Sequence, residues 1–389
     1  MAIVVVHASN QMARPRILVA DDQPDILHAL KLLLVDAGFD SDLVSSAGDV
    51  LARLDDRSYD LILMDLNYTR DTTSGGEGLD LIDRVHARDA GLPIVVMTGW
   101  GSIDTAVDAM RRGARTFVQK PWDNKLLVQV VRREVDQGLA ARRRDANLAR
   151  EHEEATLIQR ALLPSAMPQM PNWDIWALWT PASGIGGDCY DLLRLSESHL
   201  ALSIADVAGK GLPAALLMSN LQAAVRAFAS AGSRPDEVCA SVNRLLCRNV
   251  LSGKFVTFCY VVFDTLDGTV SYANAGHNPP ILMRADGRVE LLEGTGTVIG
   301  IFPDTTYYSG QLAFNPGDRL LCFTDGITEA PSQDDEEFGE GRLIDLIRST
   351  PRGSARRLAE TISDVATRWA GGALRDDATL IVVERHASN

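Results

Sequence analysis

Cysteine, basic charge and long hydrophobic runs are what this sequence has little of. Its five cysteines are odd in number, lie in the second half of the chain and form no Cys-x-x-Cys pair, which argues against a zinc knuckle and a disulfide framework. No apolar run approaches the roughly 20 residues that cross a bilayer. The first residues have no basic segment ahead of their short apolar run, unlike a signal peptide. We therefore expect a soluble, cytoplasmic protein without a membrane partner.

The shortage of basic residues also bears on partners. Lys and Arg number 38 against 52 Asp and Glu, a net charge of -14 that argues against a general affinity for nucleic acid. The excess of carboxylates directs attention to acidic metal sites instead. A length of 389 residues, with 46% hydrophobic and 23% charged residues, is typical of a globular chain with two domains and a linker.

The first domain is expected over residues 15–135. Short apolar runs at residues 17–20, 61–64, 94–97 and 116–118 alternate with helical patterns. Apolar strands that alternate with helices are typical of a parallel sheet covered on both faces, so we expect an α/β domain.

Residues 136–164 are expected to form a charged helical connector that continues the last helix of the first domain. The segment is rich in Arg, Glu, Ala and Leu, and Gly138 is its weak point because glycine disfavours a helix. A broken heptad pattern allows a homodimer but predicts no strong coiled coil; its apolar positions are Leu127, Val131, Leu148, Ala155 and Leu162.

The second domain is expected over residues 165–385. Strand-like runs at 200–205, 255–264, 319–324 and 379–383 do not alternate strictly with the helical stretches at 213–231 and 236–250. This order favours a layered α+β domain over a second parallel sheet.

Polar residues stand at the carboxyl ends of the first domain's strands, where ligands of parallel sheets gather. They are Asp21, Asp22, Asp65, Thr98 and Lys120. Carboxylates packed this closely repel, and a divalent cation with a preference for oxygen relieves the repulsion. A lysine amine provides a point charge for a phosphoryl oxygen.

This set resembles the receiver domain of two-component response regulators, with a flavodoxin-like, five-stranded parallel sheet. The resemblance implies that Asp65 accepts a phosphoryl group from a sensor histidine kinase and that Asp21 and Asp22 hold Mg²⁺. It further implies that Thr98 and Lys120 contact the phosphoryl group. Phe117 matches the switch aromatic of the family, and an ordinary core residue is the alternative. The segment 67–76 is longer than the usual receiver turn.

The second domain repeats acidic turns next to glycine or a second acid. They read GGDCYD at 186–191, DVAGKG at 206–211, TDG at 324–326 and DDAT at 376–379. Glycine lets the backbone approach an ion, and aspartate is a hard oxygen ligand, so the set favours Mg²⁺ or Mn²⁺ over Zn²⁺. A single Asp-Gly pair is also a common structural turn.

Together with NAGHNPP at 274–280, these turns resemble the SpoIIE-like branch of the metal-dependent, protein phosphatase 2C-like (PPM) phosphatases. The resemblance implies an α-β-β-α sandwich with two metal ions, Mn²⁺ or Mg²⁺. Asp206 would bridge the ions, the carbonyl of Val207 would complete one, and Asp325 and Asp376 would bind the second. Asp188 would support the site, directly or through water, and Asp377 is a further candidate ligand. The expected catalytic residues are Asp188, Asp206, Asp325 and Asp376.

Several residues near these motifs have two interpretations. Ala208 stands where eukaryotic relatives carry histidine, which removes an obvious general acid. Lys210 either binds phosphate or is a solvated loop charge. His277 is expected to order its loop rather than catalyse. The acidic run 334–337 is expected to be a solvated loop, because four consecutive acids cannot converge on one ion.

The sequence therefore predicts a response regulator whose output is a serine/threonine protein phosphatase. The resemblance points to a phosphorylated anti-sigma-factor antagonist, or a similar phosphoserine protein, as substrate. The alternative is a non-catalytic adaptor with a degenerate phosphatase fold. Adaptors of this kind lose metal carboxylates, whereas the expected ligands are all present here.

Overall fold

The computed structural model describes residues 14–66, 76–99, 103–182, 184–249 and 253–387. The chain forms two compact units, divided between Ala149 and Arg150. None of the helices within these ranges is long and apolar enough to cross a membrane.

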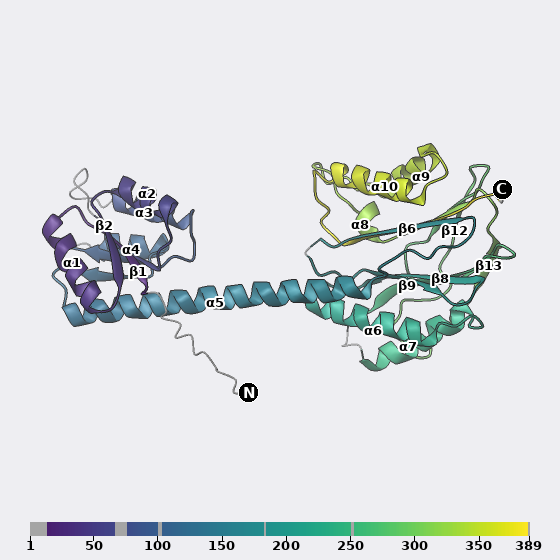
Figure 1. The fold of residues 1–389 in the computed structure, drawn as a ribbon, viewed down its shortest axis with the longest axis horizontal. Coiled ribbons are helices and arrows are strands. Elements are labelled where there is room, and N and C mark those ends of the chain that lie inside the picture. Colours follow the sequence, from purple (N-terminus) through teal and green to yellow (C-terminus); the bar gives the residue numbers. More distant parts are fainter. Residues whose placement is uncertain (1–13, 67–75, 100–102, 183, 250–252, 388–389) are drawn as a thin grey trace, which may run out of the picture. The chain divides into compact units, whose positions relative to one another are not determined.

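The first unit is built on a parallel sheet of five strands in the order β2-β1-β3-β4-β5. The strands are β1 (Arg16–Ala20), β2 (Asp40–Val44), β3 (Leu61–Asp65), β4 (Ile94–Thr98) and β5 (Thr116–Gln119), and the helices between them are α1 (Pro24–Asp36), α2 (Ala47–Asp56), α3 (Gly76–His86) and α4 (Ile103–Arg111). Alternate residues of one strand enter opposite cores: Leu18 joins one and Ile17 the other. Both faces of the sheet are therefore buried, and the predicted α/β fold is confirmed (Figure 1).

The last helix of the first unit, α5 (Asn124–Leu162), continues without interruption for 39 residues. Leu127 and Val131 are fully buried in a hydrophobic core of the first unit. The heptad interpretation was therefore wrong at these two positions, because the first turns of α5 cover the sheet. Gly138 is not a weak point either: a Cβ at this position would lie 2.8 Å from Cγ of Pro93, so the glycine permits close packing.

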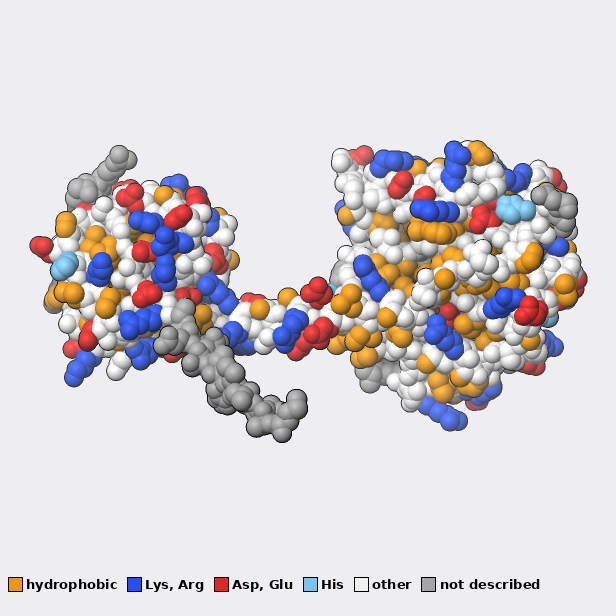
Figure 2. Space-filling view, in the orientation of Figure 1, with side chains coloured by type: hydrophobic (Ala, Val, Ile, Leu, Met, Phe, Trp, Pro, Cys, Tyr) orange, Lys and Arg blue, Asp and Glu red, His pale blue; other side chains and the backbone are white. Residues whose placement is uncertain are grey.

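Beyond Gly138 the helix becomes more exposed. Leu148 is 63% exposed, and acidic and basic side chains lie side by side along this part of α5 (Figure 2). A helix that is polar around most of its surface gains little stabilisation from burial along this part.

The second unit contains two antiparallel sheets of five strands each, in the orders β13-β10-β9-β8-β7 and β12-β11-β14-β15-β6. The strands are β6 (Trp173–Thr180), β7 (Cys189–Arg194), β8 (His199–Val207), β9 (Val256–Asp264), β10 (Thr269–Ala275), β11 (Ile281–Met283), β12 (Val289–Leu291), β13 (Gly310–Ala313), β14 (Arg319–Phe323) and β15 (Ala378–Arg385). One hydrophobic core lies between the sheets.

Helices cover the outer face of each sheet (Figure 1). The first sheet packs on α6 (Leu212–Phe228) and α7 (Pro235–Asn249), and the second packs on α8 (Asp325–Thr328), α9 (Gly339–Ser349) and α10 (Ala355–Trp369). The predicted α-β-β-α sandwich is therefore confirmed.

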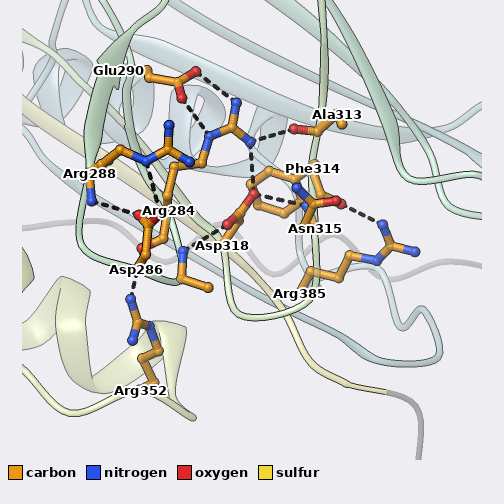
Figure 3. Close-up of polar contacts among 11 residues, drawn as sticks. Arg284, Asp286, Arg288, Glu290, Ala313, Phe314, Asn315, Asp318, Arg352 and Arg385 are labelled. Carbon is orange, nitrogen blue, oxygen red and sulfur yellow. Dashed lines mark hydrogen bonds and ion pairs between the residues drawn. The ribbon is translucent and has the colours of Figure 1, made fainter.

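A network of paired charges lies at the start of β14, next to Asp318 (Figure 3). Arg284 Nη2 lies 2.7 Å from Glu290, and its Nη1 lies 2.9 Å from Asp318. The hydrogen bond with Glu290 outweighs partial burial and raises the pKa of Arg284. Each of these charges faces an opposite charge, so the network joins two turns without needing an ion.

Candidate functional site

The structure brings the predicted receiver acids together at one edge of the sheet. Oxygens of Asp21, Asp22 and Asp65 all lie within 4.8 Å of one another, and Asp21 and Asp65 are buried. Lys120 Nζ lies 2.7 Å from Asp21 Oδ2 and 2.8 Å from Asp65 Oδ2. Burial lowers the pKa of Lys120, but its hydrogen bonds with these two carboxylates outweigh burial and raise it.

Thr98 and Phe117 also lie on this part of the receiver. Thr98 ends β4 and is buried, and its carbonyl accepts a hydrogen bond from the amide of Lys120 at 2.7 Å. Phe117 is 45% exposed, so its interpretation as an ordinary core residue does not hold. The long segment after Asp65 lies outside the described residues, apart from Gly76 at the start of α3.

In the second unit, three predicted metal ligands come from three separate elements. Asp206 lies near the end of strand β8, Asp325 begins α8, and Asp376 precedes β15. Burial, followed by the charges of Asp325 and Asp376, raises the pKa of Asp206 to about 7. Burial and Asp376 also raise the pKa of Asp325. These carboxylates therefore repel one another, because no cationic side chain among the described residues balances their negative charges fully.

Asp188 directly precedes β7 and is almost completely buried. Its Oδ2 accepts hydrogen bonds from the hydroxyls of Thr324 at 2.6 Å and Thr379 at 2.7 Å. Burial, with the charge of Asp206, raises the pKa of Asp188 well above its usual range. The sequence interpretation missed both threonines, although each stands within two residues of a predicted acid.

Asp377 holds a loop in place. Its Oδ1 accepts a hydrogen bond from the amide of Ala182 at 2.9 Å, and its Oδ2 accepts one from the amide of Gly187 at 2.6 Å. These contacts favour a bracing role for Asp377 over the metal ligation considered for it.

Two glycines allow the backbone to come close to this site. A Cβ on Gly187 would lie 2.8 Å from the carbonyl oxygen of Val207, and one on Gly326 would overlap the carbonyl of Asp377. Replacing either glycine would move the loops that carry the acids, which explains why glycine adjoins aspartate in these turns.

The donor set fits a pair of hard divalent cations. Carboxylates and one carbonyl present oxygen only, which suits Mg²⁺ or Mn²⁺. Within the described ranges, these acids are not among the groups whose ligand atoms all lie within 4.8 Å. A site for two ions distributes its ligands, so no single sphere has to contain them all. A compact group of Asp174, Glu384 and His386 does occur, but Arg319 lies 2.7 Å from Glu384 and balances it.

His277 is buried away from solvent. Its Nδ1 lies 2.9 Å from the hydroxyl of Thr257, and burial lowers the pKa of His277 to about 4. Asn274 exchanges hydrogen bonds with the backbone of His277 at 2.8 and 3.1 Å. A neutral, enclosed imidazole in this position supports the expectation that His277 orders its loop.

A recess of about 220 Å³ adjoins the acids and includes Lys210, Glu329, Arg375 and Asp376 in its lining. Lys210 Nζ lies 3.0 Å from Asp376 Oδ2. Burial and the charge of Asp325 raise the pKa of Glu329, a residue that the sequence interpretation did not single out. The acidic run 334–337 is exposed, with Asp335 3.5 Å from Arg375, consistent with a solvated turn.

Gln159 is a second residue that the sequence interpretation missed. It lies near the end of α5 and is 3% exposed. Its Nε2 donates to the carbonyl of Gly186 at 2.6 Å, and its Oε1 accepts from the amide of the same residue at 3.0 Å. The connector helix is thus bonded to the loop that leads directly to Gly187 and Asp188.

Comparison with known proteins identifies a family for each of the two units. The family described as response regulator receiver domain matches residues 17–132. The family described as stage II sporulation protein E (SpoIIE) matches residues 196–386.

Among the similar proteins are two curated relatives and one solved structure, each of which aligns with more than half of the chain. Phosphoserine phosphatase RsbU of Bacillus subtilis (strain 168) is 34% identical, covering 60% of this chain and 70% of RsbU. Protein IcfG of Synechocystis sp. is 30% identical, covering 61% of this chain but only 42% of IcfG. The SiaA-PP2C domain of Pseudomonas aeruginosa is 25% identical with a TM-score of 0.55, covering 62% of this chain and 98% of that domain.

Proposed function

Since the chain belongs to the SpoIIE family and carries a response regulator receiver domain, we propose that it is a metal-dependent serine/threonine phosphoprotein phosphatase regulated at Asp65. In this proposal the receiver takes a phosphoryl group from a cognate sensor histidine kinase. The second domain then hydrolyses a phosphoserine or phosphothreonine protein.

The observation that carries the phosphatase proposal is the unbalanced acid cluster around Asp206. Burial and neighbouring carboxylates raise the pKa of Asp206 to about 7. In a non-catalytic adaptor, carboxylates that repel one another in a partly buried site would cost stability without serving a function. Divalent cations remove this opposition, so the cluster supports the enzyme over the adaptor.

The chain's own residues define how such a site works. Asp206, Asp325, Asp376 and the carbonyl of Val207 would hold the ions, and Asp188 would keep the loops in register through its threonine contacts. Ions held there would supply Lewis-acid chemistry that activates water near neutral pH and neutralises charge on the phosphoryl group. Ala208 has no proton to donate, so the leaving oxygen lacks a side-chain acid at that position.

In the receiver, Asp65 is the proposed acceptor of the phosphoryl group. Asp21 and Asp22 would hold Mg²⁺ beside it, and the Lys120 amine, which pairs with Asp65 Oδ2 at 2.8 Å, would contact a phosphoryl oxygen. Phosphorylation adds negative charge to this pair, so Lys120 and Thr98 are expected to move toward the new group.

The connector helix is the proposed transmitter between the sites. It begins in the receiver core and ends at the Gln159–Gly186 contact. A change in the order or self-association of α5 would alter this contact and so shift Gly187 and Asp188. A phosphorylation-dependent homodimer is one such change, and we expect phosphorylation to activate.

The proposed substrate is a phosphorylated anti-sigma-factor antagonist or a similar phosphoserine protein in the cytoplasm. The name of RsbU as a phosphoserine phosphatase supports this substrate class. The acidic surface of the chain favours such a protein over nucleic acid as partner.

A phosphatase assay of the full chain tests the proposal. Hydrolysis of a phosphoserine protein should require Mn²⁺ or Mg²⁺ and should rise when acetyl phosphate is added. Asp206→Ala is the control for the active site, and Asp65→Asn is the control for the receiver. Hydrolysis that persists in chelator would contradict the proposed metal dependence.

A further inference from the structure

Lys210 lies between the proposed metal site and the adjoining recess. It belongs to the loop between β8 and α6, only four residues after Asp206. Positive φ angles of 108° at Gly209 and 72° at Gly211 shape this loop on both sides of the lysine. Such angles favour glycine, so the loop is built to fold back at Lys210.

The lysine amine contacts a predicted metal ligand. Lys210 Nζ lies 3.0 Å from Asp376 Oδ2 and 3.5 Å from the carbonyl oxygen of Arg375. Asp376 lies 166 residues further along the chain, so the tertiary fold alone creates the pair. The amine therefore contacts a carboxylate that is assigned to the second proposed metal position.

We propose that Lys210 is a displaceable counterion. It neutralises Asp376 in the metal-free chain, gives way when a divalent cation binds, and then contacts the phosphate of the substrate. The inference deepens the proposed function and rests on it.

Electrostatics support the displacement. An ammonium group and a divalent cation on the same carboxylate repel strongly at a separation of a few ångströms. The pair is also easy to open, because the side chains of Lys210 and Asp376 are 63% and 51% exposed and such pairs are weak in water. Metal binding can therefore displace the amine at little cost.

The displaced amine could move into the recess that Lys210 already lines. Lys210 lines its wall together with Gly326 and Asp376, at the side of the acid cluster. A phosphoryl group held at the cluster would present oxygens within reach of this wall. A lysine is suited to bind them as a mobile point charge.

Mn²⁺ binding to the full chain tests the first half of the proposal without relying on activity. Free Mn²⁺ is followed by electron paramagnetic resonance, and Asp206→Ala, run in parallel, defines the contribution of the receiver site. Lys210→Met should bind Mn²⁺ up to about fivefold more tightly at the phosphatase site, because it removes the amine that competes for Asp376.

Arg375→Met is the matched control. Arg375 carries the same charge, adjoins Asp376 in sequence and lines the same recess, but its guanidinium lies 3.5 Å from Asp335. This variant should change the Mn²⁺ affinity less than twofold. An equal gain in both variants would indicate a diffuse charge effect and overturn the proposal, as would unchanged or weaker binding in Lys210→Met.

Inorganic phosphate tests the second half. Calorimetry with the Mn²⁺-saturated chain should show about fivefold weaker phosphate binding in Lys210→Met, whereas Lys210→Arg should stay close to the native value. Undiminished phosphate binding in Lys210→Met would overturn this half. If the native chain binds no more Mn²⁺ than Asp206→Ala, the proposed metal-dependent function itself fails, a result distinct from the others.

Discussion

The two acidic sites of this chain balance their charges in opposite ways. In the receiver, Lys120 is largely buried and contacts both Asp21 and Asp65. In the phosphatase domain, Lys210 is mostly exposed and contacts Asp376 at the edge of the cluster. One site therefore contains its own cation, while the other leaves Asp206 and Asp325 to repel each other.

This difference separates the two kinds of chemistry. In the proposed function, the receiver would use its internal amine to hold a phosphoryl group formed on Asp65. The phosphatase site would instead take up external cations, which would relieve the repulsion among its carboxylates and act on phosphorus. The arginine network of Figure 3 differs from both sites. There, Arg284 already pairs with Glu290 and Asp318, so its charges are balanced within the chain.

The largest expected effect comes from Asp65→Asn. Among the receiver acids, Asp65 is the one at the end of β3 that pairs with Lys120, and its replacement removes the attacking carboxylate oxygen. Acyl-phosphate formation from acetyl phosphate should disappear while the fold persists. The check is radioactive labelling alongside circular dichroism. Stoichiometric labelling of the variant would show that another residue accepts the phosphoryl group.

The next effect comes from Asp206→Ala. Removing the central carboxylate should lower Mn²⁺-dependent phosphatase activity at least about a hundredfold, as for the larger changes around metal sites. Steady-state rates with a phosphoserine protein measure this loss. Asp334→Asn, in the exposed turn, is the control and should retain the native rate. Comparable losses in both variants would contradict the assigned site.

A smaller effect is expected at the connector. Gln159→Ala removes both hydrogen bonds to Gly186, so the stimulation by phosphodonor should fall severalfold while each domain stays folded. Arg160→Ala changes the exposed neighbour on the same helix and should leave the stimulation intact. Rates with and without acetyl phosphate provide the measurement.

A flexible Gly-Ser insertion tests the same connection from the other side. Gly138 packs against Pro93, so the insertion belongs further along, near the exposed Leu148. Receiver phosphorylation and phosphatase activity should both persist, but phosphorylation should no longer change the phosphatase rate. Full stimulation after insertion would assign the signal to direct contact between the domains.

The smallest effect concerns pH. The pKa of Asp206 lies at about 7, above its value of roughly 4 in an unfolded chain. Between these values the folded state binds more protons, so stability in chelator should fall as the pH rises from 5 to 7.5. We expect a decrease of a few degrees in melting temperature, smaller in Asp206→Asn because Asp188 and Asp325 still contribute, and reversed by Mn²⁺. A melting temperature that rises with pH in chelator would contradict the assigned charge state.

Much of the fold and several site residues could be predicted from local patterns. Strands buried on both faces read as continuous apolar runs, and their ends place Asp21, Asp65 and Lys120 on one edge of a parallel sheet. The acidic turns were visible because glycine adjoins Asp188 and Asp325, where the backbone packs closely. Their assignment as metal ligands remains a prediction.

Other features depended on contacts that no local pattern records. Gln159 lies in a charged helix and resembles a solvent-facing residue, yet the tertiary fold buries it against Gly186. Leu127 fits a heptad seam as well as a core, and the sheet beneath it decides between them.

The sequence by itself determined the two folds and the residue types from which each site could be built, because periodicity, turns and charge are local properties. Only the tertiary structure decided how those charges are balanced. Lys120 meets Asp65 across 55 residues, and Lys210 meets Asp376 across 166. Electrostatic balance depends on distance in space, and that distance is fixed only when sheets and helices pack together.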